Sequence, residues 1–103
     1  MTDERIKIEK PWGYEVILHQ NPFYVIKHIY VLKGHRLSKQ YHRLKYESWI
    51  MPDGTLKHIK PMEIHRLEAT DKDLSVIEIS SPHLDDLVRL EDDYDRVYSE
   101  IKR

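Results

Sequence analysis

Residues typical of turns divide this chain into short segments, and these segments have the composition of β-strands. The longest is 23–32, FYVIKHIYVL, which consists mainly of the β-branched and aromatic residues that are enriched in strands. Asn21-Pro22 before it and Lys33-Gly34 after it are turn signals. Shorter segments of the same kind occupy 14–19, 47–51, 55–59, 64–69 and 74–80. Short strands separated by frequent turns predict an all-β sandwich or barrel of antiparallel strands.

The longest segment also predicts how it is packed. Alternation places on one of its faces Lys27 together with Val25, Ile29 and Val31. The other face carries Tyr24, Ile26, His28 and Tyr30. Because both faces are partly apolar, we expect the segment to be covered on both sides, as in a sandwich or barrel.

The two ends of the chain carry different signals. Residues 1–9 alternate weakly, which predicts an N-terminal arm or an edge strand. Apolar residues recur at helical spacing in 92–103, which predicts a short C-terminal helix. Residues 83–91 fit either a helix or a last strand. We interpret 1–103 as a single domain, because a chain of this length forms one core.

The composition argues against several classes of partner. The formal net charge of -1 provides no overall field that would attract nucleic acid or an anionic membrane. No apolar run approaches the roughly 20 residues of a membrane span, and the first ten residues lack the apolar core of a signal peptide. The absence of Cys excludes disulfides and thiolate metal sites. These features predict a cytoplasmic protein with no nucleic-acid or membrane partner.

Residues that can bind a metal ion are concentrated in 34–54. Gln40, His42 and Glu47 have the spacing Q-x-H-x4-E. In a strand, Gln40 and His42 lie on the same face. A turn over 43–46 would let Glu47 open a second strand alongside the first, and the three side chains would then converge in a nitrogen and oxygen site for a divalent ion. The spacing alone also fits a hairpin with unrelated polar side chains.

The same stretch resembles a known sequence motif. Over 34–54 the chain reads G-x5-Q-x-H-x4-E-x6-G, which fits the first cupin motif, G-x5-H-x-H-x4-E-x6-G, with Gln40 at the first ligand position. Together with KPWGYEV upstream and LVRLEDDYDR downstream, it resembles the cupin domain of type II mannose-6-phosphate isomerases. The same domain also occurs fused behind mannose-1-phosphate guanylyltransferases. The resemblance covers about residues 10–96 and implies a small, jelly-roll-like cupin barrel.

The second cupin motif, G-x5-P-x-G-x2-H-x3-N, is incomplete. Only Pro61 and His65 match it, with a spacing one residue short. Only 55–60 separate the two motifs, where family members usually place two strands. A barrel trimmed in this way is expected to be thin or open on one side. We predict that a homodimer closes it through a strand from 5–9, and the alternative is a monomer covered by the helix over 92–103.

The resemblance implies a set of site residues. The metal ligands would be Gln40, His42, Glu47 and His65, and the ion would be zinc, manganese, iron or nickel. The candidates for a catalytic base are Lys27, His28 and Glu15. The candidates for binding a substrate phosphate are Arg36, Lys39, Arg43 and Arg89.

Two functions of different classes follow. The first is a metal-dependent isomerase that binds a small sugar phosphate and interconverts mannose 6-phosphate and fructose 6-phosphate. In such an enzyme a base moves a proton between C1 and C2 through an enediol. The alternative is a non-catalytic cupin that binds a sugar or sugar nucleotide and is accessory to a nucleotidyltransferase. The intact first motif favours the enzyme, and the incomplete second motif favours the binding module.

Overall fold

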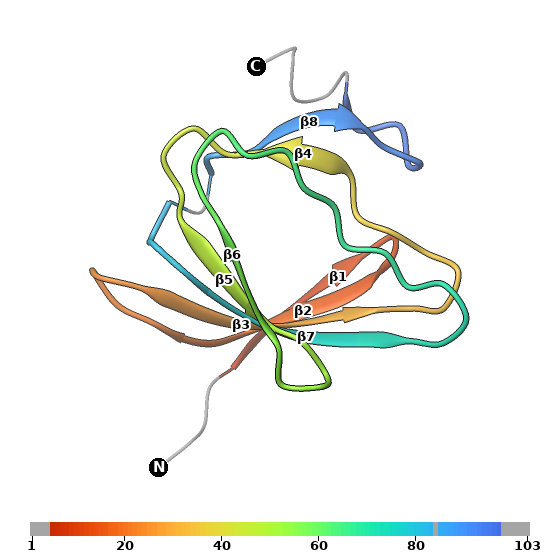
Figure 1. Ribbon diagram of the computed structural model, residues 1–103, viewed down its shortest axis with the longest axis horizontal. Coiled ribbons are helices and arrows are strands. Elements are labelled where there is room, and N and C mark those ends of the chain that lie inside the picture. Colours follow the sequence, from red (N-terminus) through yellow and green to blue (C-terminus); the bar gives the residue numbers. More distant parts are fainter. Residues whose placement is uncertain (1–4, 84, 98–103) are drawn as a thin grey trace.

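A computed structural model describes residues 5–83 and 85–97, which form two facing antiparallel β-sheets (Figure 1). The larger sheet has the strand order β1-β2-β3-β7-β5-β6, and the smaller sheet pairs β4 with β8. The strands of the larger sheet are β1 (Ile6–Lys10), β2 (Gly13–Gln20), β3 (Val25–Val31), β5 (Glu47–Ile50), β6 (Leu56–Ile59) and β7 (Leu74–Ser80). Those of the smaller sheet are β4 (Lys39–Tyr41) and β8 (Val88–Glu91). The predicted all-β class is confirmed.

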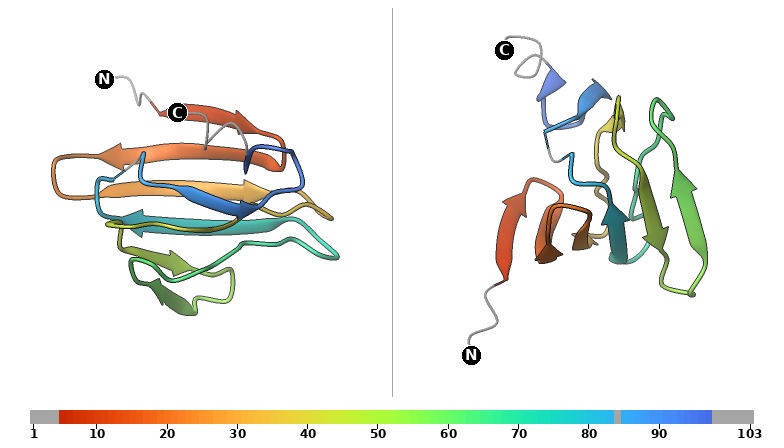
Figure 2. Two further views of the ribbon diagram at one scale, coloured as in Figure 1. Left: turned by 90° about the horizontal axis from the view of Figure 1, so that it is seen from above. Right: turned by 90° about the vertical axis from the view of Figure 1, so that its left-hand side faces the viewer.

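The smaller layer is wider than its two regular strands, because a further segment pairs with the free edge of β4. Gln40 and His65 exchange two backbone hydrogen bonds, of 3.0 and 2.9 Å. The Leu37 amide donates to the Leu67 carbonyl at 2.9 Å. The segment 64–69, expected to be extended, therefore lies beside β4. Figure 2 shows this layer lying over one face of the larger sheet.

The space between the layers holds both an apolar core and buried polar groups. The alternation predicted for β3 is observed, with Val25, Ile29 and Val31 buried. The core cluster contains Trp12, Ile29, Val31, Trp49, Ile59, Leu67, Ala69 and Val76. The buried charged and imidazole side chains are His42, Lys45, Glu47, His65 and Glu78. Ionisable side chains thus occupy part of the interior of a small domain, where each requires a partner.

The turn between β1 and β2 depends on a glycine. Gly13 has a φ of 150°, and a Cβ at this position would lie 2.0 Å from the Tyr30 carbonyl oxygen. Only glycine therefore allows β2 and β3 to approach this closely. The adjacent Trp12 is buried, and its carbonyl accepts a hydrogen bond from the Leu32 amide at 2.9 Å. The turn fixes the Trp12 ring against the core.

The expected hairpin that placed residue 40 and residue 47 on adjacent strands is wrong. β4 pairs with β8, whereas β5 pairs with β6 and β7 in the facing sheet. The loop between them crosses from one sheet to the other, and the Asp86 carboxylate accepts hydrogen bonds from the amides of Arg43, Leu44 and Lys45. Asp86 satisfies three backbone donors that a regular hairpin would have paired with a neighbouring strand.

The structure also decides between the alternatives at the chain ends. Ile6–Lys10 forms an edge strand, and the ambiguous region 83–91 contains the strand β8. Of the helix expected over 92–103, residues 92–96 are irregular with a turn at 93–94, only residue 97 is helical among those described, and 98–103 lie outside the described residues. Asp95 has a φ of 60°, which interrupts a right-handed helix. Within the described residues, no helix is long and apolar enough to span a membrane.

The homodimer remains a prediction, and we propose that β1 provides its contact. Among the described strands β1 pairs only with β2, so its other edge presents unpaired backbone groups that can add a strand from a second copy. Light scattering coupled to size exclusion should give about twice the 12.5 kDa chain mass at micromolar concentration. Deleting residues 1–9 should shift the protein toward monomer, and deleting 1–4, which retains β1, should not. A monomeric mass for the full chain would contradict the dimer.

Candidate metal centre and ligand pocket

Four side chains from both layers meet between the sheets. Gln40 lies in β4, His42 follows it, His65 is held beside Gln40 by backbone pairing, and Glu47 opens β5 in the facing sheet. Glu47 Oε2 is 3.3 Å from His42 Nε2, and Glu47 Oε1 is 3.4 Å from His65 Nε2. One ligand atom from each of these three residues lies within 4.8 Å of the others. The structure therefore brings together the four residues that the sequence proposed as ligands.

Backbone hydrogen bonds determine which nitrogen of each imidazole faces the centre. His42 Nδ1 bonds to the Asp86 carbonyl, and His65 Nδ1 bonds to the Glu63 carbonyl at 2.9 Å. A carbonyl oxygen can only accept, so Nδ1 carries the proton in each neutral ring. Each Nε2 then presents a lone pair toward the Glu47 carboxylate. Two imidazole lone pairs and a carboxylate repel one another unless a cation lies between them.

The donor set passes a test of fit to a divalent metal. Among the described residues, His42 Nε2 and Glu47 Oε2 are buried without a hydrogen bond, although Lys45 Nζ lies 3.2 Å from Oε2. The other carboxylate oxygen, Oε1, accepts a hydrogen bond from Trp49 Nε1 at 2.9 Å, which orients Glu47. Oriented imidazole and carboxylate ligands with hydrogen-bonded supporting groups are typical of metal sites in proteins.

Gln40 can join this set through a rotation of its amide. In the structure Gln40 Oε1 accepts a hydrogen bond from Ser38 Oγ at 2.7 Å, and Gln40 Nε2 lies 3.5 Å from His65 Nε2. Turning the amide by 180° would present Oε1 to the centre. The Ser38 hydroxyl can accept as well as donate, so it would remain bonded after the rotation. An amide oxygen is a weaker ligand than an imidazole, and we expect Gln40 to contribute least.

The electrostatics keep the centre ready to bind a cation. Burial alone would raise the pKa of Glu47, but a hydrogen bond from the protonated form of His42 and the charge of Lys45 outweigh it and lower the pKa to about 2. Glu47 is therefore ionised throughout the physiological range. Burial is also the main influence on His65, and it lowers the pKa of that imidazole. A carboxylate that stays charged and an imidazole that stays neutral are the forms that bind metal.

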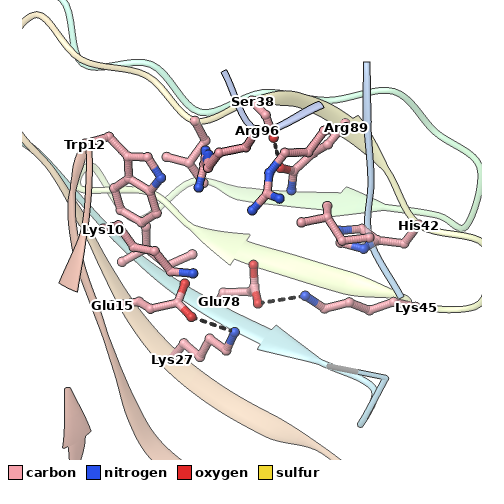
Figure 3. A pocket seen from close by; sticks show the side chains of 14 residues that line it. Lys10, Trp12, Glu15, Lys27, Ser38, His42, Lys45, Glu78, Arg89 and Arg96 are labelled. Carbon is pink, nitrogen blue, oxygen red and sulfur yellow. Dashed lines mark hydrogen bonds and ion pairs between the residues drawn. The ribbon is translucent and has the colours of Figure 1, made fainter. Parts of the chain in front are cut away.

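A cavity of about 120 Å³ adjoins this centre, and Gln40 and His42 form part of its wall (Figure 3). Its apolar walls include Trp12, Ile29, Leu37 and Leu87. Its charged lining consists of the cations Lys10, Lys27, Lys45, Arg89 and Arg96 and the acids Glu15 and Glu78. Positive charge is in excess among these lining residues, so the pocket favours an anionic ligand.

The acids in the pocket are paired with lysines. Lys27 Nζ lies 3.1 Å from Glu15 Oε1, and Lys45 Nζ lies 3.2 Å from Glu78 Oε2. Burial alone would lower the pKa of Lys45, but the carboxylates on either side of it raise the pKa above its usual value. Lys10 behaves differently. Burial lowers its pKa, and the nearby pocket cations lower it further, although Glu15 opposes them.

The structure separates the remaining candidates from the sequence into two groups. Lys27, Glu15 and Arg89 line the pocket. His28 is a correction, because it lies on the face of β3 opposite Lys27, where its ring contacts Ser75 Oγ at 2.6 Å and packs on two tyrosines. Three other candidates for phosphate binding, Arg36, Lys39 and Arg43, do not line this pocket.

Arg36 and Lys39 form ion pairs outside the pocket, and Arg43 is exposed to solvent. Arg36 forms a two-pronged ion pair with Asp93, at 2.8 and 2.9 Å. Lys39 Nζ is 3.7 Å from Glu91, and the Arg43 side chain is exposed. Sequence reasoning missed the pocket residues Lys10, Lys45, Glu78 and Arg96 as site residues. Of these, Glu78 had a detectable signal, because it is a charged residue on the inward face of an otherwise apolar strand, with Val76 and Ser80.

Two antiparallel sheets enclosing an imidazole and carboxylate centre define a cupin. A family model described as mannose-6-phosphate isomerase C-terminal matches residues 1–61. The match covers more than half of the chain, which therefore belongs to this family of cupin domains. The matched region contains the first motif and ends before His65.

Two curated relatives, AlgA and XanB, agree with this assignment. The chain is 30% identical to the alginate biosynthesis protein AlgA of Pseudomonas putida, over 99% of this chain and 25% of that protein. It is 31% identical to the xanthan biosynthesis protein XanB of Xanthomonas campestris, over 87% of this chain and 24% of that protein. The chain thus spans about a quarter of the length of the curated relatives it matches. A solved RmlC-like cupin from Methanocaldococcus jannaschii aligns over 80% of this chain and 84% of its own, at 13% identity and a TM-score of 0.37.

Metal binding should depend on His42 and not on His28. Replacing His42 by Ala removes an Nε2 lone pair from the centre, so elemental analysis of protein reconstituted with zinc or manganese should show loss of bound metal. The matched variant His28→Ala removes an imidazole from the far face of the sheet and should retain the wild-type stoichiometry. Full metal content in His42→Ala, with an unchanged thermal melt, would show that the ion binds elsewhere.

Proposed function

We propose that this chain is a metal-dependent aldose–ketose isomerase acting on a phosphorylated sugar, with mannose 6-phosphate and fructose 6-phosphate as the substrate pair. The observation that carries the proposal is the adjacency of the His42, Glu47 and His65 cluster to a pocket with excess positive charge. Such a pocket can hold the two ends of a sugar phosphate at once. Membership in the mannose-6-phosphate isomerase C-terminal family supports the choice of substrate.

The carbonyl end of the sugar would lie at the metal centre. Gln40, His42, Glu47 and His65 would hold the ion, which when bound would supply polarisation of the sugar carbonyl. The His42 and His65 backbone contacts keep both Nε2 atoms directed inward before a ligand arrives. The pocket's apolar side chains would pack against the sugar carbons, and Trp12 provides a flat surface for one face of the sugar.

The phosphate end of the sugar would lie among the pocket cations on the side of β8 and Lys10, away from the glutamates of the pocket floor. Lys10, Arg89 and Arg96 line the pocket, and the lowered pKa of Lys10 reflects burial together with mutual repulsion among these positive charges. A phosphate dianion would relieve that repulsion and accept charge-assisted hydrogen bonds. The guanidinium groups of Arg89 and Arg96 carry several N–H donors each, and Asp92 holds Arg96 in place through Nε and Nη2 at 2.8 and 2.9 Å.

A second function has specific support. The chain spans about a quarter of its curated relatives, and the family match ends before His65. The incomplete second motif and the short 55–60 connection favour a non-catalytic module that binds a sugar or sugar nucleotide alongside a nucleotidyltransferase. A cationic pocket would serve this role equally well, so catalysis is the property that separates the two functions.

A coupled assay distinguishes the two functions. Purified protein reconstituted with each of zinc, manganese, iron and nickel should convert mannose 6-phosphate to fructose 6-phosphate, and chelation should abolish the turnover because the carbonyl loses its polarising ion. Isothermal titration with mannose 6-phosphate, mannose and GDP-mannose should show that only the first binds tightly. Metal-loaded protein that binds a sugar nucleotide but turns over no sugar phosphate would instead establish the accessory role.

A further inference from the structure

We propose that the Glu78 carboxylate is the base that moves the proton between C1 and C2, an assignment that rests on the isomerase function proposed above. Glu78 lies in the middle of β7, with its side chain between the two sheets. It forms part of the pocket floor, with Glu15 and Lys27 on one side and Lys45 on the other (Figure 3). A base for this reaction must lie beside the metal centre and face the sugar, and Glu78 has this position.

The link between Glu78 and the metal centre is a single ammonium group. Lys45 Nζ lies 3.2 Å from Glu78 Oε2 and also 3.2 Å from Glu47 Oε2. The Asp86 carboxylate holds the Lys45 backbone in the loop that joins the two sheets. The Lys45 ammonium group therefore bridges Glu78 and the Glu47 carboxylate of the centre, and Glu78 lies on the pocket side of this bridge. A sugar carbon next to a carbonyl held at the metal centre would then lie close enough to the Glu78 carboxylate for proton transfer.

The other acid–base groups on the pocket wall are less suited to this role. Glu47 is not among the residues that line the pocket, and as a metal ligand its carboxylate would be engaged by the ion. The strand order places Glu78 on β7, next to β5 and Glu47. Lys27 on β3 and Glu15 on β2, two of the three candidate bases from the sequence, lie two and three strands from β5.

The surroundings of Glu78 raise the pKa of its carboxyl, which makes its carboxylate a stronger base. Burial is the largest influence and raises the pKa of the Glu78 carboxyl, and the charge of Glu47 on β5 adds to this. Lys45 from the loop and Lys27 from β3 act in the opposite direction. Arg89 and Arg96 line the same pocket from the opposite side. A carboxylate is a better base when its pKa lies closer to the working pH, provided that it remains ionised.

The step balances without any co-reactant. Glu78 takes the proton from C2 of the open-chain aldose, and the C–H electron pair becomes the C1–C2 double bond. The carbonyl π pair becomes a lone pair on O1, which gains a proton from solvent, to give the enediol. Glu78 then returns its proton to C1, O2 loses a proton to solvent, and a carbonyl forms at C2. Nothing is oxidised or reduced overall.

The test uses the metal-loaded protein in D₂O with mannose 6-phosphate. Glu78→Gln should lower both the isomerisation rate and deuterium incorporation into the sugar at least 100-fold, the lower limit expected for a general base. Metal content, thermal melt and affinity for glucitol 6-phosphate, which has no carbonyl, should stay within threefold of wild type. Glu78→Asp, which keeps the charge but withdraws it by one methylene, should lose about 10- to 100-fold in turnover with metal and fold intact.

A variant of the competing carboxylate separates the role of Glu78 from the loss of an ion pair in the pocket. Glu15→Gln breaks the half-buried Lys27–Glu15 pair, and because Glu15 is not the base in this account, it should retain deuterium exchange and lose less than tenfold in turnover. Glu78→Gln within tenfold of wild type, or loss of exchange in Glu15→Gln alone, would overturn the assignment. If wild-type protein with bound metal turns over no sugar phosphate, the isomerase function fails and the role of Glu78 fails with it. If the wild type and the Glu78→Gln variant are both active, the isomerase function stands and only the role of Glu78 as the base is refuted.

Discussion

The arrangement of this domain depends on the Glu47 carboxylate facing two imidazole lone pairs. Because backbone carbonyls at 63 and 86 bind the Nδ1 atoms of His65 and His42, neither ring can turn its proton inward while it is neutral. Trp49 fixes the carboxylate from behind. A buried cluster of acceptors is unfavourable unless a cation joins it. The surrounding strands thus hold an arrangement that a divalent ion would stabilise.

Alternating charges extend this constraint across the pocket floor. Glu47, Lys45 and Glu78 form a continuous chain of ion pairs, and Lys27 with Glu15 continues the alternation beside it. Buried charges are costly unless each is paired, and removing one member leaves another uncompensated. The ion pairs therefore explain how a domain of this size can place so many charged groups between its sheets. The same groups provide a binding surface for an anion and a base beside the metal centre.

The sequence predicted the β-class and named four candidate ligands that the structure places together, but it did not predict how they meet. Alternation and motif spacing identify Gln40, His42 and Glu47, yet local spacing cannot show that the strands of Gln40 and Glu47 lie in opposite sheets. Lys27 and His28 were equally plausible, because both faces of β3 are partly apolar and neighbouring residues point to opposite faces. The pairing of Lys45 with Glu78 joins residues far apart in the chain, and no local pattern predicts it.

A crystal structure of the metal-loaded protein, with anomalous scattering measured at the absorption edge of the ion, tests the metal centre most directly. The account predicts one peak bonded to His42 Nε2, His65 Nε2 and a Glu47 oxygen, at about 2.0–2.2 Å for zinc. Both Nδ1 atoms should remain on their backbone carbonyls. An ion bound through Nδ1, or bound away from Glu47, would contradict the account, as would a metal-soaked crystal in which Glu47 contacts only the imidazoles and Lys45.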